Sequence, residues 1–342
     1  MTEAELTSLA GRALEGLGLP AREAAQVARI LVMGDLFGHA THGVLRLESY
    51  GQRIDAGAIR ADAQVLIEAV APAIARVDGN GAIGPRVGMV ALEAALERAR
   101  ALGVGFALVR NGNHFGAIAP YCYLAAEQGF ATIIGSNAST TIAPTGGRGE
   151  RLGNNPLAIG VPRPGNDPII LDMAMSVVAR GKIRAAAQRG EAIPSDWATD
   201  REGRPTTDPR AALEGFLLPF GGYKGYGLAL MVDLIAGVLS GGAYLTHVKS
   251  WLDQPTEPGN LGHFFLAIDT RTLGSPEWLA QRVADFAAIV HDTPRADPAR
   301  PVRLPGEIEM EQLARHRRDG IEIDDALRQT LEGFASRLAA RA

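Results

Sequence analysis

Cysteine and long apolar runs are nearly absent from this 342-residue sequence. The single cysteine, Cys122, has no partner for an internal disulfide, which indicates a reducing compartment and a thiol packed in the core. No apolar run is long enough to cross a bilayer. Residues 1–18 contain Glu3 and Glu5 and lack the apolar segment of a signal peptide. We therefore expect a cytoplasmic protein without a membrane partner.

Basic charge and metal-ligand patterns are also missing. The formal net charge is −4 and no basic stripe is visible, so nucleic acid is not expected as a partner. His39 and His42 lie three residues apart, but glycines flank them, no third ligand is evident and H-E-x-x-H is absent, so we expect no metal. The absence of G-x-S-x-G argues against a serine nucleophile.

The sequence does contain alternating helix and strand patterns with 46% hydrophobic residues, which is typical of a globular α/β protein. Its length indicates two domains or one large domain. Helices are expected at 2–33 with a break at 17–20, at 41–53, 86–101, 118–129, 175–190, 223–242 and 277–290, and in the charged C-terminal segment. Strands are expected at 63–70, 73–79, 104–110, 131–137, 157–162, 168–174 and 263–269.

The stretch DGNGAIG, residues 78–84, lies between an expected strand and an expected helix and spells G-x-G-x-x-G. This spacing suits the phosphates of a dinucleotide. A true fingerprint, however, is followed about 20 residues later by an acidic residue at the end of the next strand. Here that strand ends in Arg110, which would suit the 2′-phosphate of NADP. We favour a structural turn with positive φ angles for these glycines.

His42 and Arg46 are four residues apart in THGVLR. On a helix with Thr41 as its N-cap, they share one face with β-carbons roughly 6 Å apart. Arginine can hold a carboxylate with two parallel hydrogen bonds. Its charge also favours the neutral imidazole that a general base needs. The pair fits a 2-hydroxy or 2-oxo acid; the alternative is a surface helix with an incidental histidine and arginine.

Two loops carry further candidates. In RNGNHFG, residues 110–116, Asn113, His114 and Gly116 suit a phosphate or a nicotinamide amide at a helix N-terminus, or form an ordinary loop. The polar loop 135–156 is long enough to be functional, and its Asn154 would hold a substrate or serve in a turn.

Two later stretches also suit a cofactor. Asp172 ends a strand, where a carboxylate accepts from ribose hydroxyls or caps a helix, and Lys182 lies in the helix expected next. GGYKGYG, residues 221–227, opens an apolar helix. Its glycine N–H groups and Lys224 suit a pyrophosphate, although the stretch lacks the P-loop pattern. The alternative is a glycine-rich N-cap.

Together these stretches form an ordered set across residues 35–310: THGVLRL, NHFG, GNNPLAIGVP, LDMAMSVVARGKI, DWATDREGRPTTDP, GGYKGYGLALMVDLIAGVL, NLGHFFLAID and LPGE. The set resembles the malate/L-lactate dehydrogenase family of the second, non-Rossmann type, which includes ureidoglycolate, sulfolactate, diketogulonate and imino-acid enzymes. The resemblance implies an α/β fold with a mixed, largely antiparallel sheet, flanking helices and a helical part built from both chain ends. It also implies a homodimer or a higher oligomer.

The resemblance further implies site residues. The catalytic histidine of the family matches His42, with Arg46 on the substrate carboxylate, but in some members the histidine matching His114 is the base. Lys182 and Asn154 are expected near the substrate. NAD or NADP is expected at His114, Phe115, Gly116, Ala117, Ile118, Asp172, Met173, Ala174, Lys224, Gly225, Pro305 and Gly306.

Two residues depart from the usual family pattern, since Thr41 replaces a serine and Asn154 a threonine. Lys182 stands where the imino-acid reductases have an aspartate. Lysine favours a small L-2-hydroxy acid, malate-like or lactate-like, over a cyclic imino acid such as pyrroline- or piperideine-2-carboxylate. A diketo sugar acid is a further alternative, and a nucleotide-binding protein without activity is a third interpretation.

Three parts are expected along the chain. Residues 1–74 form a helical part that carries His42 and Arg46. Residues 75–300 bind the cofactor and include a substrate loop at 241–262. Residues 301–342 form helices that return to the first part.

Overall fold

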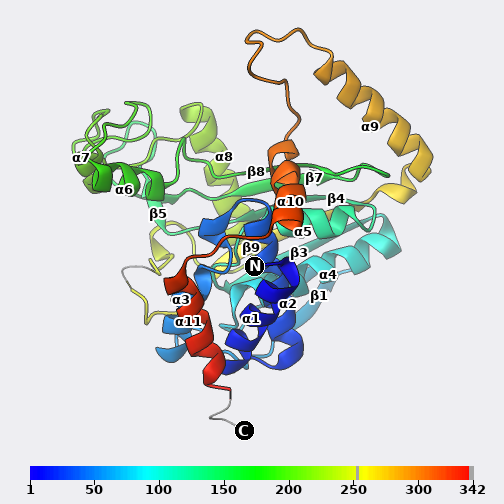
Figure 1. Ribbon diagram of the computed structural model, residues 1–342, viewed down its shortest axis with the longest axis horizontal. Helices are drawn as coiled ribbons and strands as arrows, with labels where there is room; N and C mark the ends of the chain where they lie inside the picture. The colour runs from blue at the N-terminus through cyan, green and yellow to red at the C-terminus, as the bar shows by residue number, and fades with distance from the viewer. Residues whose placement is uncertain (252–253, 339–342) are drawn as a thin grey trace.

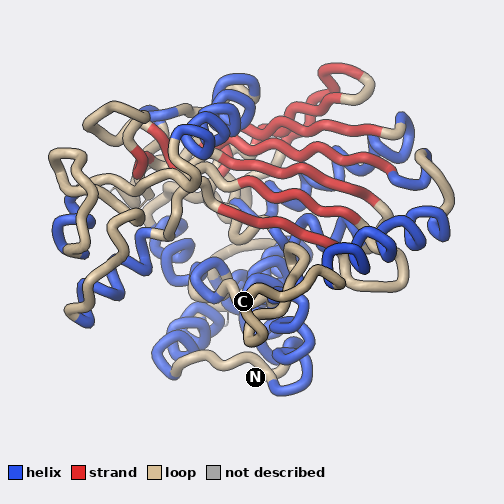
Figure 2. Tube along the Cα trace, turned by 90° about the horizontal axis from the view of Figure 1, so that it is seen from above, coloured by secondary structure: helices blue, strands red, loops and turns tan. Residues whose placement is uncertain are grey.

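A seven-stranded sheet lies at the centre of the computed structural model, which describes residues 1–251 and 254–338 (Figures 1 and 2). The strands are ordered β1-β2-β3-β9-β4-β7-β8; β2 and β3 run parallel, and the other neighbouring pairs run antiparallel. The expected α/β class with a mixed, largely antiparallel sheet is therefore confirmed. The strand bounds are β1 Leu66–Ala71, β2 Ile74–Asp78, β3 Val104–Gly112, β4 Phe130–Ser136, β7 Leu157–Val161, β8 Ile169–Met173 and β9 Leu261–Asp269, with a separate small pair β5 Thr140–Ile142 and β6 Leu152–Gly153.

Helices surround this sheet. Their bounds are α1 Glu3–Gly16, α2 Ala21–Leu36, α3 Arg46–Asp55, α4 Gly84–Leu102, α5 Ala119–Ala126, α6 Arg180–Arg189, α7 Pro209–Glu214, α8 Tyr223–Asp233, α9 Pro276–His291, α10 Glu307–Asp319 and α11 Asp325–Ser336. The expected break between the first two helices is confirmed, as is the start of α1. Thr2 accepts from the N–H of Glu5 at 3.2 Å, and the Glu5 carboxylate accepts from the N–H of Thr2 at 2.8 Å.

The two ends of the chain pack together. In Figure 1, α11 lies beside α1, and it also packs against α3. The N-terminal ammonium of Met1 donates to the carbonyl of Ile321 at 2.8 Å, and the N–H of Ile321 donates to the carbonyl of Met1 at 2.7 Å. The division of the chain into three parts, with bounds at residues 74 and 300, stays a prediction. Of the expected substrate loop and the C-terminal part, Leu252, Asp253 and residues 339–342 lie outside the described residues.

Two hydrophobic cores hold the fold. The first runs from the N-terminal helices into the sheet and includes Leu6, Tyr50, Phe115 and Phe265. Cys122 is fully buried in it, as expected. The second core lies under α6, α7 and α8. Because Tyr50 and Phe115 both belong to the first core, α3 and the loop after β3 are anchored in the same hydrophobic core.

Two expected helices begin later in the structure. The helix predicted at 41–53 is wrong at its start: a 3-10 turn, Ala40–His42, precedes α3, and Thr41 caps no helix. Gly43 separates them with an extended backbone (φ −90°, ψ −147°). The helix predicted at 175–190 begins at Arg180, because residues before it pair with the segment before α8: the N–H of Val177 donates to Leu218 at 2.9 Å.

A third expected helix, 223–242, is α8 followed by a π-helical segment, Leu234–Leu239. Such segments interrupt α-helices without ending the run. The helix expected at 86–101 is confirmed as α4.

The glycines of DGNGAIG are required by packing at two positions and by backbone conformation at the third. A β-carbon on Gly84 would lie 2.0 Å from the carbonyl oxygen of His114, and one on Gly79 would lie 2.7 Å from that of Asn111. Gly81 has φ +74°. Arg110 is already paired, since its Nε donates to Asp78 at 3.0 Å. This turn therefore supports the loop that carries His114, and the structural interpretation explains all three glycines.

Candidate functional site

Two histidines meet beside α3. His42 ends the 3-10 turn that follows α2, and His114 lies in the loop between β3 and α5. Their ring centroids are 5.4 Å apart. Both side chains are half-buried, whereas their chain neighbours Gly43 and Phe115 are buried. The structure therefore joins the two histidines that the sequence offered as rival bases.

Asp35, in the last turn of α2, holds the segment after His42. Its carboxylate accepts from the N–H of Val44 at 2.8 Å. A β-carbon on Gly43 would lie 2.1 Å from the same carboxylate, so glycine is required there. Burial raises the pKa of Asp35 to about 7. This contact explains why the helix cannot start at Thr41.

Arg46 does not stack on His42 along one helical face, as the sequence had suggested, because α3 begins at Arg46. Instead its Nε donates to the carbonyl of Thr41, and Thr41 Oγ1 lies 3.0 Å from Nδ1 of His42. The guanidinium carbon lies 4.9 Å from the ring centroid of Trp251, and this indole stacks on His114 at 5.3 Å. Arg46 is thus connected to His42 through Thr41 and to His114 through Trp251.

The electrostatics of the site favour neutral imidazoles. Burial lowers the pKa of His42 to about 4, with further lowering by Arg46 and His39. Burial, followed by His42 and Arg46, also holds the pKa of His114 well below its usual range. The expected effect of the neighbouring guanidinium is confirmed, but burial is the larger cause. Both rings can therefore act as proton acceptors near neutral pH.

Two contacting residues were missed by the sequence analysis. Tyr50 Oη lies 2.7 Å from Nδ1 of His114, and Trp251 covers the ring of the same histidine. Tyr50 is one helical turn after Arg46, a spacing that puts both on one face and is visible in the sequence. Trp251 comes from the expected substrate loop, 241–262, and had no local signal.

Three of the expected cofactor segments meet at the edge strand β8. The Asp172 carboxylate accepts from the N–H groups of Ile118 and Ala119, at 3.0 and 2.8 Å. Burial, the largest effect, raises the pKa of this carboxyl despite those bonds. The N–H of Ile170 donates to the carbonyl of Pro305 at 3.2 Å, and Gly306 has φ +91° where a β-carbon would lie 2.9 Å from Ile170. Asp172 thus fixes the start of α5 rather than standing free.

The fourth cofactor segment, Lys224–Gly225, opens α8. The segment just before it is joined to the one after β8, because the N–H of Phe220 donates to the carbonyl of Met175, next to Ala174, at 3.0 Å. Within the part of the chain that the structure describes, the first-turn N–H groups of α8 at residues 223–225 have no hydrogen-bond acceptor. Free N–H groups and an exposed lysine at a helix start fit a phosphate, so this segment suits a dinucleotide.

Asn154 and Lys182 are not in contact with the histidines in the described structure. Asn154 is half-buried, and its carbonyl accepts from the N–H of Met175 at 2.7 Å. Lys182 is exposed on α6, which packs against α7. The neighbouring Asn155 is fully buried and structural: it accepts from Ala138 and donates to Ala229, each at 2.9 Å.

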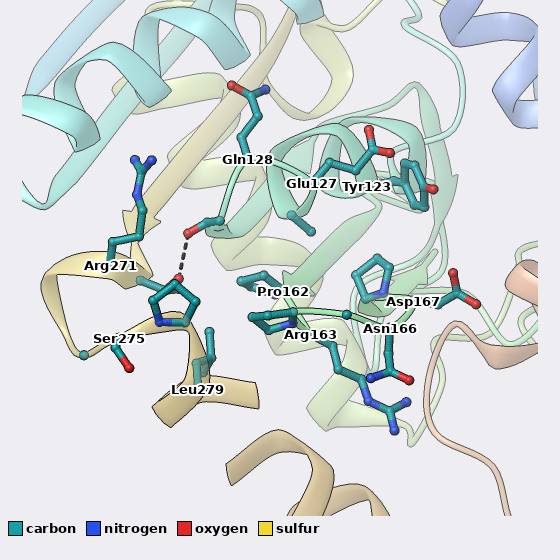
Figure 3. A pocket seen from close by; sticks show the side chains of 18 residues that line it. Tyr123, Glu127, Gln128, Pro162, Arg163, Asn166, Asp167, Arg271, Ser275 and Leu279 are labelled. Carbon is teal, nitrogen blue, oxygen red and sulfur yellow. Dashed lines mark hydrogen bonds between the residues drawn. The ribbon is translucent and has the colours of Figure 1, made fainter. Parts of the chain in front are cut away.

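A surface cavity of ≈ 710 Å³ lies elsewhere, at the C-terminal end of α5, between loop 162–168 and the start of α9 (Figure 3). None of the expected site residues lines it. Figure 3 shows the guanidinium groups of Arg163 and Arg271 directed away from one another, so they do not converge on a common anion. The histidine cluster is the candidate site instead, because perturbed pKa values and polar contacts gather there.

Neither a metal-binding cluster nor a membrane-spanning helix is present among the described residues. No group of three or more histidine, cysteine or acidic side chains is placed to hold a metal ion among them. Within the same residues, no helix has the length and apolar character that crossing a membrane requires.

Comparison with known proteins gives the family. The chain is 38% identical over 325 residues to an L-sulfolactate dehydrogenase of Methanothermobacter thermautotrophicus, covering 95% of this chain and 93% of the other. It is 34% identical over 334 residues to a Delta(1)-pyrroline-2-carboxylate/Delta(1)-piperideine-2-carboxylate reductase of Pseudomonas aeruginosa, covering 97% and 98%. The solved structure of sulfolactate dehydrogenase from Methanocaldococcus jannaschii matches with a TM-score of 0.92 and 34% identity, covering 99% and 97%. Residues 1–332 match the family model for malate/L-lactate dehydrogenase, and the chain therefore belongs to that family.

Proposed function

We propose that this protein interconverts a small L-2-hydroxy acid and its 2-oxo acid by hydride transfer with a nicotinamide cofactor. The observation that carries the proposal is the pair of neutral histidines, 5.4 Å apart, beside Arg46. Oxidation of a 2-hydroxy acid requires a base and a group that binds the carboxylate. The names of the relatives, a sulfolactate dehydrogenase among them, support this class of reaction.

Each group of the cluster has a role in this reaction. Arg46 binds the substrate carboxylate through its planar fork. His42 accepts the hydroxyl proton during oxidation and returns it during reduction. When bound, the cofactor accepts or supplies the hydride at C2 of the acid. His114 lies close enough to take the place of His42 as the base, and His42 is the preferred assignment. Thr41 orients His42 through the contact at Nδ1.

The cofactor is NAD or NADP, held by four segments: His114–Ile118, Asp172–Ala174, Lys224–Gly225 and Pro305–Gly306. Two observations support this binding site. The first-turn N–H groups of α8 have no acceptor in the described structure, and three of the four segments meet at β8. Lys224 is the candidate for a phosphate oxygen, as a mobile point charge.

The substrate is selected by residues beside the histidines and by two residues that do not contact them, Asn154 and Lys182. Thr41, Asn154, Lys182 and the loop 241–262 are the proposed determinants. Lys182 favours an open-chain hydroxy acid. A cyclic imino acid is the second candidate, since the Pseudomonas aeruginosa relative is named for that reaction, and a diketo sugar acid is a further alternative.

We further propose a cytoplasmic homodimer. The single, buried cysteine supports a reducing location. The outer face of α8 and the following π-helix exposes large apolar side chains, which supports a second chain covering it: Leu228, Met231, Leu234, Val238 and Leu239. Light scattering after gel filtration should give the mass of two chains.

The test of the reaction is a substrate panel. NADH and NADPH are each offered with oxaloacetate, pyruvate, 2-oxoglutarate, sulfopyruvate, diketogulonate and a cyclic imine, and cofactor absorbance is followed. Turnover of an open-chain 2-oxo acid is the expected result and identifies both cofactor and substrate. Turnover of the imine alone would overturn the hydroxy-acid assignment. Cofactor binding without turnover on any member would favour a binding protein.

A further inference from the structure

The hydroxyl of Tyr50 contacts His114 twice. Tyr50 Oη lies 2.7 Å from the ring nitrogen Nδ1 and 3.0 Å from the backbone carbonyl oxygen of the same residue. Tyr50 is 1% exposed, so water does not satisfy either contact. Burial also raises the pKa of Tyr50 well above its usual range, which keeps the phenol protonated. The hydroxyl therefore has one proton to place between two neighbours.

The carbonyl decides where that proton goes. A carbonyl oxygen only accepts, and a phenol has a single proton. If the Tyr50 proton points to Nδ1 of His114, the carbonyl oxygen faces a lone pair at 3.0 Å. If it points to the carbonyl, Nδ1 carries its own proton and donates it to Oη. Only the second arrangement makes both short contacts hydrogen bonds. A buried polar group that lacks a hydrogen-bond partner costs free energy, so this arrangement is favoured.

Other neighbours of the ring do not compete. The N–H of Gly116 lies 3.5 Å from Nδ1, beyond the usual range of an N–H hydrogen bond and much longer than the tyrosine contact. Trp251 stacks on the ring at 5.3 Å with an interplanar angle of 19°. Stacking touches a face of the imidazole, so it fixes the ring plane and not the position of the proton.

We propose that Tyr50 is a positioning residue that holds His114 as the Nδ1–H tautomer and leaves Nε2 free to accept a proton. Nε2 lies on the side of the imidazole away from the Tyr50 contact. His114 is half-buried while the flanking residues 112–113 and 115–120 are buried, so His114 is the most accessible residue of residues 112–120. Its catalytic consequence rests on the proposed function, in which His114 is the alternative to His42 as the base: Nε2 is the atom of His114 that would take the proton of the substrate hydroxyl in that role.

The tautomer itself is tested without activity. Nitrogen-15 NMR of histidine-labelled protein distinguishes a protonated from an unprotonated ring nitrogen, and His114→Gln assigns the signal among the seven histidines. The wild type is expected to show Nδ1 protonated and Nε2 unprotonated near pH 7. Tyr50→Phe is expected to remove that pattern at His114. An Nε2–H tautomer in the wild type, or an unchanged spectrum in Tyr50→Phe, would overturn the proposal.

A second buried tyrosine provides the matched control. Tyr121 on α5 is fully buried, and its hydroxyl donates to the carbonyl of Phe115 at 2.7 Å. Tyr121→Phe therefore removes a neighbouring buried hydroxyl without touching the ring of His114. Tyr50→Phe is expected to lower kcat by about tenfold or more with little change in cofactor KM, while Tyr121→Phe keeps kcat and the His114 spectrum.

Two outcomes separate this inference from the proposed function. Equal losses of kcat in both tyrosine variants, with the tautomer unchanged in each, would reduce Tyr50 to a structural role and overturn the inference. A wild type that shows the Nδ1–H tautomer but turns over no 2-oxo acid would overturn the proposed function alone.

Discussion

His42 and His114 come from different segments of the chain, yet their rings lie 5.4 Å apart, centroid to centroid. Burial is the largest effect that lowers the pKa of both rings, and His42 and Arg46 lower that of His114 further, so both rings stay neutral near pH 7. Two neutral imidazoles at this distance give the site a proton acceptor and a close neighbour of the same kind. Which of the two histidines is the acid/base is therefore open to a direct kinetic test.

Alanine substitution of each histidine separates their roles. His42→Ala is expected to lower kcat by about 10²–10⁴, because the acid/base is lost while Arg46 still binds the carboxylate. His114→Ala is expected to lower kcat less and to weaken cofactor binding as well. The measurement is the steady-state rate with the best 2-oxo acid of the panel. Near-normal turnover in His42→Ala with a large loss in His114→Ala would reverse the assignment.

The carboxylate clamp is tested by Arg46→Lys. Lysine keeps the charge but loses the planar fork and the contact with Trp251, so KM for the acid should rise about 10–100-fold, with a smaller change in kcat. Arg60→Lys is the control: Arg60 is exposed and donates to Asn80 at 3.1 Å. A substrate KM that stays at the wild-type value in Arg46→Lys would rule out the clamp.

Asp35 makes stability depend on pH. Its pKa is raised by burial from 3.8 to about 7, so folding favours the protonated carboxyl. This contribution is present below about pH 4 and is lost as pH rises towards 7. Asparagine has no such charge and can still accept from Val44. Asp35→Asn should therefore gain stability relative to the wild type between pH 5 and pH 8, measured by denaturant unfolding; a pH-independent difference would contradict this.

The structural role of DGNGAIG is tested at Gly84. A β-carbon there would lie 2.0 Å from the backbone oxygen of His114, so Gly84→Ala should destabilise the fold by about 1–3 kcal/mol and disturb the His114 loop. Gly11→Ala on α1 is the control, since no atom lies within 4 Å of its β-carbon. It should be neutral or slightly stabilising. Equal melting temperatures for the two variants would show that the turn tolerates a side chain.

Much of the fold could be predicted from the sequence. Alternation and apolar runs gave the sheet strands, and the Thr2–Glu5 pattern gave the start of α1. The start of α3 could not be predicted, because Asp35, nine residues upstream, captures the N–H of Val44 and favours a 3-10 turn. The extended segment before α6 depends on pairing with Leu218, which local propensity does not contain.

The residues of the candidate site could likewise be predicted only in part. His42, Arg46 and His114 have residue types and spacings that indicate chemistry, and the sequence named all three. Tyr50 and Trp251 contact them only through the tertiary fold, and a buried tyrosine or a loop tryptophan is ordinarily a packing residue. Asp172 was named for its position at a strand end, but its partners, the N–H groups of α5, became visible only in the structure.

The most direct test of the central claim follows the hydride itself. The protein is incubated with the best 2-oxo acid of the panel and a reduced cofactor carrying deuterium at both C4 positions, and the product is analysed by mass spectrometry and NMR. The account predicts a 2-hydroxy acid with one deuterium at C2, formed in step with oxidised cofactor. Cofactor oxidation without deuterium at C2, or no 2-hydroxy acid at all, would contradict it.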